Sequence, residues 1–233
     1  MYEVSTSLLN LTDNINGDEK SFNFEKGKEA EVILKLEKAR TDYYHIDVTD
    51  GIFVEKVDYD WMKGLCSYIK RISNLPLDIH LMVKDVKSAV DDFAALEPNI
   101  ISFHYEACKD DEEVMKMIDL IKSYNCRVGI AINPDTPAEK IYRFLPYIHL
   151  ILVMTVKPGK GGQGFIPEML NKIEEFKKYQ TDNNLDFQIE VDGGVNLATC
   201  EKVKQAGAEV LVAGTAIINA VDYKVIIDEL KKE

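Results

Sequence analysis

Two histidines and two aspartates stand at or near the ends of three short apolar runs. The first run carries His45 and Asp47, the second carries His80, and the third leads into Asp192. Each run has the composition of a buried strand, and the carboxyl ends of parallel strands meet at one edge or rim. Imidazole and carboxylate groups brought to one point form the donor set of a divalent metal with open coordination positions. These four residues predict a metal site, with Zn2+ or Fe2+ favoured and Mn2+ or Co2+ also compatible.

A hydrogen-bonded pair in the core is the alternative interpretation of His45 and Asp47. Their i, i+2 spacing places both side chains on one face of a strand, and buried charged groups are normally paired. His80 and Asp192, at the ends of two further strands, favour the metal site over the pair. His104 also ends an apolar run, and we expect it to be a hydrogen-bonding residue at the same rim rather than a further ligand.

Short β-rich runs alternate with longer amphipathic stretches along the chain. Eight strands are predicted, at 3–8, 43–48, 77–82, 100–104, 127–132, 150–154, 187–191 and 210–213. Helices with a 3.6-residue apolar period are predicted at 28–40, 86–96, 114–124, 170–180, 199–206 and 222–232. Apolar strands that alternate with helices indicate βαβ units and a parallel sheet. We expect the polar stretch 12–28 to form a long surface loop.

The fold class predicted from this alternation is α/β, a single (β/α)8 TIM barrel formed by residues 1–233. The chain of 233 residues is close to the length of about 250 residues that is typical of this barrel. An open doubly wound sheet is the competing architecture. The barrel is favoured because successive strand ends carry polar residues, and the active sites of such barrels lie at that rim.

Composition narrows the possible partners and location. The net charge is −12 and the sequence pI is about 4.9, which argues against nucleic acid and an anionic membrane surface because both attract basic patches. The four cysteines are widely spaced, which is typical of reduced thiols in a cytosolic protein. No signal-peptide pattern or long apolar run appears. We therefore expect a cytoplasmic protein with no nucleic-acid or membrane partner. We also expect a small-molecule substrate and a homo-oligomer.

Three glycine-rich turns follow the last three predicted strands. They contain Gly159, Lys160, Gly161 and Gly162 in the first turn, Gly193 and Gly194 in the second, and Gly214 and Thr215 in the third. Glycine lets backbone N–H groups approach an anion closely, and the last two βα loops of a TIM barrel commonly bind phosphate. One such turn is ordinary loop chemistry. Three in succession predict a ligand that carries a phosphate group.

Several motifs of the chain resemble signatures of the ribulose-phosphate 3-epimerase family. They are His45-Ile-Asp47-Val-Thr-Asp50-Gly51, Asp78-Ile-His80-Leu-Met82, Phe-His104-Tyr-Glu106-Ala, Met154-Thr-Val-Lys-Pro-Gly-Lys-Gly-Gly-Gln163 and Glu-Val-Asp192-Gly-Gly-Val. The resemblance is collinear from Ser7 to about Ile217. The stretch Met-Thr-Val-Lys-Pro-Gly…Phe-Ile-Pro-Glu-Met-Leu is also similar to the hexulose branch, the allulose-6-phosphate 3-epimerases.

The resemblance implies a TIM barrel that holds one divalent metal through His45, Asp47, His80 and Asp192. It implies that Asp47 and Asp192 are the catalytic acid–base pair, which inverts C3 of a ketose phosphate through a metal-stabilised enediolate. The substrate-binding residues that it implies are Ser7 and His80 at the sugar, Met82 and Met154 in the surrounding wall, and Gly159, Lys160, Gly161, Gly162, Gly193, Gly194, Gly214 and Thr215 toward the phosphate.

The chain departs from the family pattern near the expected pocket. Thr49 stands where the family usually has Met, Ile52 where it has His, Lys160 where it has an aromatic residue, and Thr6 where it has Pro. These changes leave the four metal-site residues intact but alter their surroundings. We expect conversion of D-ribulose 5-phosphate to D-xylulose 5-phosphate, with D-allulose 6-phosphate as the alternative substrate.

Two other classes of function are compatible with a phosphate-binding barrel. A non-catalytic sugar-phosphate-binding barrel would be favoured if one of the four ligands were missing, and none is. A metal-dependent aldolase or a decarboxylase is the other class, and a decarboxylase of this kind would carry a catalytic lysine near its strand aspartate. No lysine accompanies His45-Ile-Asp47, so the epimerase interpretation is preferred.

Overall fold

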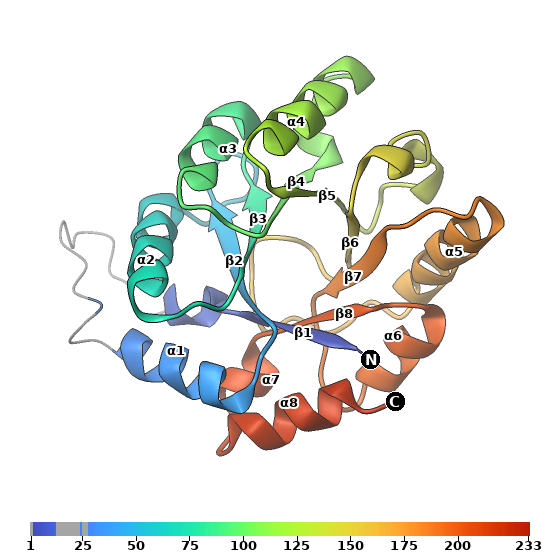
Figure 1. Cartoon of the computed structure of the whole chain (residues 1–233). Helices are drawn as coiled ribbons and strands as arrows, with labels where there is room; N and C mark the ends of the chain where they lie inside the picture. The colour runs from blue at the N-terminus through green and yellow to red at the C-terminus, as the bar shows by residue number, and fades with distance from the viewer. Residues whose placement is uncertain (1, 13–23, 25–27) are drawn as a thin grey trace.

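Eight parallel strands close into a barrel, and the helices surround it (Figure 1). The structure is a computed structural model that describes residues 2–12, 24 and 28–233. The strands are β1 (Glu3–Ser7), β2 (Tyr43–Thr49), β3 (Leu77–Met82), β4 (Ile100–His104), β5 (Arg127–Ile132), β6 (Leu150–Met154), β7 (Gln188–Asp192) and β8 (Val210–Ala213). Each strand pairs with its sequence neighbours, and β1 pairs with β8. The predicted TIM barrel is confirmed, with strand bounds within one residue of those expected.

The helical segments lie outside the barrel. The α-helices are α1 (Lys28–Ala39), α2 (Tyr59–Ile72), α3 (Val86–Ala94), α4 (Asp111–Ser123), α5 (Met169–Asp182), α6 (Cys200–Ala206), α7 (Thr215–Ile218) and α8 (Tyr223–Lys231). Short 3-10 segments are η1 (Leu9–Thr12), η2 (Tyr105–Ala107), η3 (Ala138–Lys140) and η4 (Leu145–Tyr147). The six predicted helices are present. Helix α4 begins three residues earlier than expected because the Asp110 side chain accepts a hydrogen bond from the Glu113 N–H and caps it.

Helix α2 is an element that the sequence patterns do not predict. Its sequence contains Gly64 and several aromatic residues, which have modest helix propensity. The helix nevertheless buries one continuous face, which includes Trp61, Leu65 and Ile69, against the barrel wall. Burial of an amphipathic face supplies most of the stability of a protein helix, so the tertiary contacts explain why this segment is helical.

Strand side chains alternate between an apolar outer layer and a more polar interior. The outward residues, such as Ile79 and Leu81 of β3, join a large core with the helices. Inside the barrel a smaller apolar cluster includes Leu150, Leu152 and Met154. Other inward positions on β2, β3 and β7 carry histidine and carboxylate side chains, which are buried except for the partly exposed Asp192. The interior is therefore apolar on one side and charged on the other.

Most of the predicted loop 12–28 lies outside the described residues, which omit 13–23 and 25–27. Thr12 ends η1, and Lys28 begins α1. No described helix is both long enough and apolar enough to cross a membrane. The four cysteines all lie in the described part of the chain, and none of them forms a disulfide.

Helix α1 provides a matched test of the outer core. Leu36 is fully buried, whereas Leu34 is 46% exposed on the same helix. We expect Leu36→Ala to lower the free energy of unfolding by about 2–5 kcal/mol, because it removes buried methyl groups and leaves a cavity. Leu34→Ala should change it by less than about 0.5 kcal/mol. Urea unfolding of both variants measures the difference, and equal losses would contradict the assigned packing of α1.

Candidate functional site

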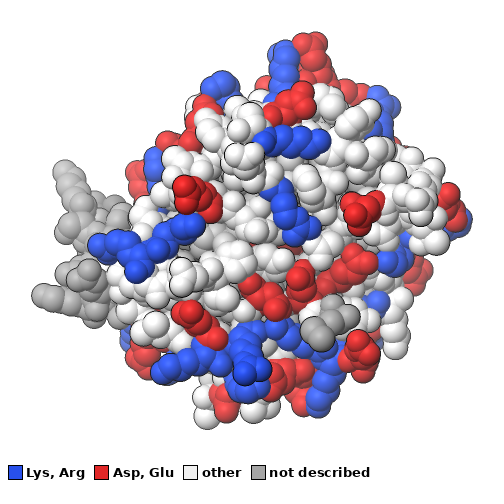
Figure 2. Space-filling view, in the orientation of Figure 1, with Lys and Arg blue, Asp and Glu red and all other residues white. Residues whose placement is uncertain are grey.

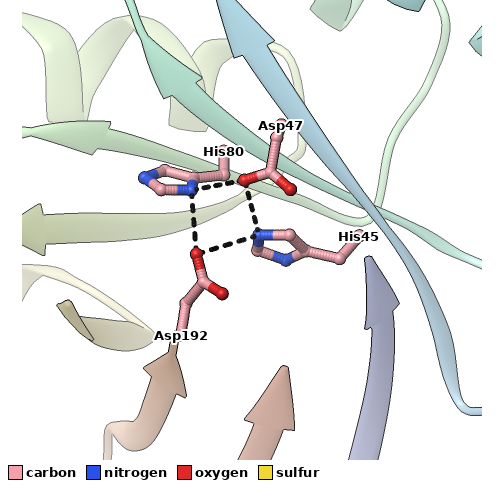
Figure 3. Close-up of side chains that lie close together, drawn as sticks. All are labelled: His45, Asp47, His80 and Asp192. Carbon is pink, nitrogen blue, oxygen red and sulfur yellow. Dashed lines mark hydrogen bonds and ion pairs between the residues drawn. The ribbon is translucent and has the colours of Figure 1, made fainter. Parts of the chain in front are cut away.

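The structure brings His45, Asp47, His80 and Asp192 together at the carboxyl end of the barrel (Figure 3). Asp47 Oδ1 lies 3.1 Å from His80 Nδ1 and 3.4 Å from His45 Nε2. Asp192 Oδ2 lies 3.7 Å from His80 Nδ1 and 4.0 Å from His45 Nε2. The four donor atoms thus form a ring around one point, and all of them lie within 4.8 Å of one another.

This ring has the dimensions and chemistry of a divalent metal site. Two ligands that each lie about 2.0–2.2 Å from one ion are separated by about 3–3.6 Å in tetrahedral or octahedral geometry, close to the separations observed. The Nε2 atom of His45 is buried and makes no hydrogen bond among the described residues. A buried nitrogen with an unused lone pair is costly unless it has a ligand. The cluster could therefore hold a divalent metal.

Strand register places these side chains beside one another. In the β2–β3 pair His45 lies opposite Asp78, and Asp47 lies opposite His80. The Nδ1 atom of His45 is 2.6 Å from Asp78 Oδ2, so its proton is directed to Asp78 and its Nε2 atom to the cluster. Since an outer carboxylate of this kind orients a histidine ligand, Asp78 holds the His45 ring with Nε2 facing the other donors.

The two aspartates of the cluster have opposite electrostatic environments. Burial alone would raise the pKa of Asp47, but the charge of the neighbouring His45 and the proximity of His80 lower it well below its usual range. Burial, together with the negative charge of Asp47, raises the pKa of Asp192 to about 7. Asp47 is therefore ionised at neutral pH, whereas Asp192 is divided between the carboxylate and the protonated acid. Such a split is typical of paired acid–base groups.

A cavity of about 270 Å³ opens above the cluster. Its walls include both aspartates and eleven of the predicted substrate-binding residues: Ser7, Met82, Met154, Gly159, Lys160, Gly161, Gly162, Gly193, Gly194, Gly214 and Thr215. His45 and His80 are fully buried beneath it and are not among the lining residues. The Ser7 hydroxyl donates to Asp47 Oδ2 over 2.8 Å, so Ser7 contacts an aspartate of the cluster as well as the cavity.

The glycine turns that follow β6, β7 and β8 line the same cavity as the two aspartates. Gly193 and Gly194 have φ values of +119° and +69°, a region that favours glycine. A Cβ atom on Gly194 would lie 2.6 Å from the backbone nitrogen of Phe165, so this turn packs directly against the preceding loop. After Gly214, α7 begins at Thr215 and leaves N–H groups at its first turn. Backbone donors of this kind can bind an anion.

Several site residues were not identified from the sequence. Asn10 lines the cavity, and its side-chain amide donates to Thr215 Oγ1 over 2.8 Å. Asp78 and Glu190 lie buried under the cluster, and His45, Asp78 and Glu190 form a second group of potential ligands. Asp78 and Glu190 each precede a predicted ligand by two residues. Residues spaced in this way point to the same face of a strand, so the sequence could have indicated that both side chains point into the barrel.

The residues that depart from the family pattern lie in different environments. Thr49 is fully buried at the end of β2, where its N–H donates to Asp58 Oδ1 over 2.9 Å. Ile52 is 76% exposed in the following loop. Lys160 lines the cavity, and its carbonyl accepts a hydrogen bond from the Gln163 side chain. Of these three positions, only Lys160 lies directly at the cavity.

His104 lies beside His80, as expected of a hydrogen-bonding residue at the rim. The two Nε2 atoms are 2.9 Å apart, and the rings are stacked. Burial lowers the pKa of His104 to about 4, so its imidazole is neutral at neutral pH.

Charge on the molecular surface is mixed. Figure 2 shows lysine and arginine side chains interspersed with aspartate and glutamate over the face drawn. Among the described residues of this face, no broad area is covered by basic side chains alone. This distribution agrees with the net charge of −12 and differs from the continuous basic surface of a nucleic-acid-binding protein.

Solved structures of other proteins share the fold at low sequence identity. The KGPDC of Streptococcus mutans has a TM-score of 0.69 and 11% identity, over 99% of this chain and 95% of that one. The 3-hexulose-6-phosphate synthase of Salmonella typhimurium has a TM-score of 0.63 and 16% identity, over 98% and 96% of the two chains. These similarities establish a common barrel fold.

Closer similarity is found at the level of sequence. Curated proteins named ribulose-phosphate 3-epimerase are 39% identical in Methanocaldococcus jannaschii, over 87% of this chain and 83% of that protein, and 40% identical in Escherichia coli K12, over 84% and 85%. The relative in Bacillus subtilis is 38% identical over 85% and 90%. The model of the ribulose-phosphate 3 epimerase family matches residues 21–218. Together with the barrel and its cluster of two histidines and two aspartates, these matches show that the chain belongs to the ribulose-phosphate 3-epimerase family.

Proposed function

We propose that the protein interconverts D-ribulose 5-phosphate and D-xylulose 5-phosphate by inverting the configuration at C3. The observation that carries this proposal is the position of Asp47 and Asp192 on two strands around one point, at the base of a cavity that ends in three glycine turns. Relatives that are 38–40% identical bear the name of this activity. The geometry supplies two acid–base groups for the carbon and a separate end for the phosphate.

Inversion next to a ketone requires a proton to leave one face of the carbon and another to arrive on the opposite face. Asp47 and Asp192 supply the two groups, since Asp47 is ionised and Asp192 can take either the acid or the carboxylate form near neutral pH. The hydroxyl of Ser7 and the imidazole of His80 each contact Asp47 and hold its orientation. The two groups exchange roles in the reverse reaction.

The remaining cavity residues position the sugar and limit access of water. The side chains of Met82 and Met154 are almost completely buried and form an apolar wall next to the aspartates. A dry wall strengthens the electrostatic interactions within the site. Backbone N–H groups of the glycine turns would hold the phosphate, and this remote binding energy would orient the reacting carbon.

His45, Asp47, His80 and Asp192 would hold one divalent ion, for which Zn2+ and Fe2+ are our first candidates and Mn2+ and Co2+ are compatible. When bound, the ion would supply a Lewis acid that stabilises the negative charge which develops on the sugar oxygens.

The proposal includes a location and an assembly state. Four free cysteines support a cytoplasmic location, because thiols persist in reducing compartments. The loop after β2 exposes Ile52 and Val57, at 76% and 72%, and these apolar side chains support a homo-oligomer. The substrate is a small sugar phosphate, and no nucleic-acid or membrane partner is proposed.

A substrate panel on the metal-loaded protein tests the proposed function. We expect kcat/KM for D-ribulose 5-phosphate to exceed that for D-allulose 6-phosphate. The hexulose should still react measurably, because a pocket that does not hydrogen-bond one extra group discriminates by only about 10–200-fold. Prior removal of metal with a chelator should abolish both activities, and added Zn2+ or Fe2+ should restore them. A higher kcat/KM for the hexulose would overturn the substrate assignment, and activity unaffected by chelation would remove the metal.

The two aspartates can be separated by isotope exchange. Asp47→Asn and Asp192→Asn should each lower epimerisation by at least about 10²-fold, because a positioned acid–base group contributes about 10²–10⁴. One variant should still exchange the C3 proton with solvent, because its single remaining base reaches one face. Turnover and proton exchange are measured on the same samples with metal content as the control. Wild-type turnover by either variant would exclude that residue from the mechanism.

A pair of glycine variants in neighbouring loops tests the phosphate end. Gly194→Ala places a Cβ atom against the Phe165 backbone at a positive φ, whereas a Cβ on Gly164 would meet nothing within 4 Å. We expect Gly194→Ala to raise KM for the sugar phosphate about tenfold or more and to weaken competitive inhibition by inorganic phosphate. Gly164→Ala should resemble the wild type. Equal KM values for the two variants would place phosphate binding elsewhere.

A further inference from the structure

His80 uses both ring nitrogens, and the two face different partners. Its Nδ1 atom faces Asp47 and Asp192, at 3.1 and 3.7 Å. Its Nε2 atom lies 2.9 Å from Nε2 of His104, with the ring centroids 5.0 Å apart. Two imidazole nitrogens at this distance share one proton, so one of them must donate and the other accept. The position of that proton determines whether Nδ1 of His80 carries a lone pair toward the cluster.

Glu106 determines the direction of this hydrogen bond. Its Oε2 atom lies 3.2 Å from Nδ1 of His104, and its Oε1 atom accepts bonds from the Asn133 N–H, at 2.8 Å, and from the Thr136 hydroxyl. An ionised carboxylate only accepts, so His104 donates from Nδ1. A neutral imidazole has one N–H, so Nε2 of His104 accepts. His80 therefore donates from Nε2, and its Nδ1 lone pair faces Asp47 and Asp192. A lone pair and carboxylate oxygens are all acceptors, so a cation between them would stabilise this arrangement.

The turn at residues 133–136, which binds the Glu106 carboxylate, is also held by a lysine. Lys172 of α5 is 9% exposed, and its ammonium group donates to the carbonyls of Asn133, Pro134 and Thr136 at 3.0, 2.6 and 2.7 Å. Glu106 accepts from the N–H and hydroxyl groups of the same turn. A buried lysine with three carbonyl partners has all its donors satisfied. The turn is therefore anchored to both α5 and Glu106, which limits movement of the carboxylate.

We propose that His104 and Glu106 are positioning residues that keep the proton of His80 on Nε2 and leave Nδ1 available to a divalent cation. This inference rests on the metal site of the proposed function. It parallels the arrangement at His45, where Asp78 accepts directly from Nδ1 and leaves Nε2 for the cluster. His45 has its carboxylate in direct contact, whereas His80 reaches its own through a second imidazole. Hydrogen bonds of this kind fix the tautomer and orientation of histidine ligands.

Glu106→Gln should reverse the order of donors and acceptors without a change of shape. The amide oxygen is expected to take the position that receives two donors, from Asn133 and Thr136, because an NH2 group there would face both of them. The NH2 group then faces Nδ1 of His104, which must accept. Nε2 of His104 becomes the donor, Nε2 of His80 becomes the acceptor, and the His80 proton moves to Nδ1, where it opposes binding of a cation.

The experiment combines two measurements on the full-length protein. Nitrogen NMR of histidine-labelled, chelator-treated protein reports the tautomer of His80, and the chain has only four histidines to assign. Competition with a chelator reports the affinity for Zn2+. We expect protonated Nε2 in the wild type, protonated Nδ1 in Glu106→Gln, and an affinity about 10–100-fold weaker in the variant. Glu209→Gln is the matched control, because Glu209 pairs with Lys177 outside this chain of contacts.

The wild-type tautomer in Glu106→Gln, with Zn2+ affinity equal to that of Glu209→Gln, would overturn the inference. If Glu106→Gln does not fold, His104→Phe replaces it, since the ring is kept and the acceptor for His80 is removed. The inference then requires a loss of Zn2+ affinity of similar size, and an unchanged affinity overturns it. Failure of the wild type to bind Zn2+ would instead refute the metal of the proposed function, while the tautomer of the metal-free protein still decides the role of Glu106.

Discussion

The register between β2 and β3 is the constraint on which the candidate site depends. It places His45 opposite Asp78 and Asp47 opposite His80, so two histidines receive a carboxylate neighbour from one pair of strands. A shift of one residue would move every inward side chain of a strand to the outer face. Such a shift would expose the apolar outer residues to the interior and bury the charged residues among the helices. The apolar outer layer and the polar site therefore stabilise the same register.

The two layers of the barrel have different roles, because the outer layer stabilises the fold and the interior carries the candidate site. Its outer layer joins the strands to the helices through a large core of buried apolar residues. Its interior contains buried histidines and carboxylates, and isolated charges there would be costly. These groups instead contact one another, through His45 with Asp78, Ser7 with Asp47, and His80 with His104. These contacts offset part of the cost of burial, although both carboxylate oxygens of Glu190 make no hydrogen bond among the described residues. The donors that face the common centre are complementary to a cation.

The position of the cavity explains how one scaffold could combine binding with proton transfer. The aspartates lie on strands, whose backbones are fixed by neighbours on both sides, and rigid elements position reactive groups accurately. The glycine turns lie on loops beyond the strand ends, where backbone N–H groups are available to an anion. Contacts such as that between Asn10 and Thr215 join the first and last βα loops across the closure of the barrel. Both ends of a sugar phosphate can then be held by parts of the chain that are far apart in sequence.

The sequence alone determined the eight strands, because buried parallel strands are short, continuous apolar runs that differ clearly from amphipathic helices. It also indicated His45, Asp47, His80 and Asp192, because polar residues in such runs are rare and parallel strands share a carboxyl end. Helix α2 was missed because its stability comes from contacts with the barrel rather than from its own propensity. Asn10 and the roles of Asp78 and Glu106 were also beyond the sequence. Hydrogen-bond direction depends on which atoms meet across strands and loops, and only the tertiary structure decided that the carboxylate of Glu106 reaches His80 through His104.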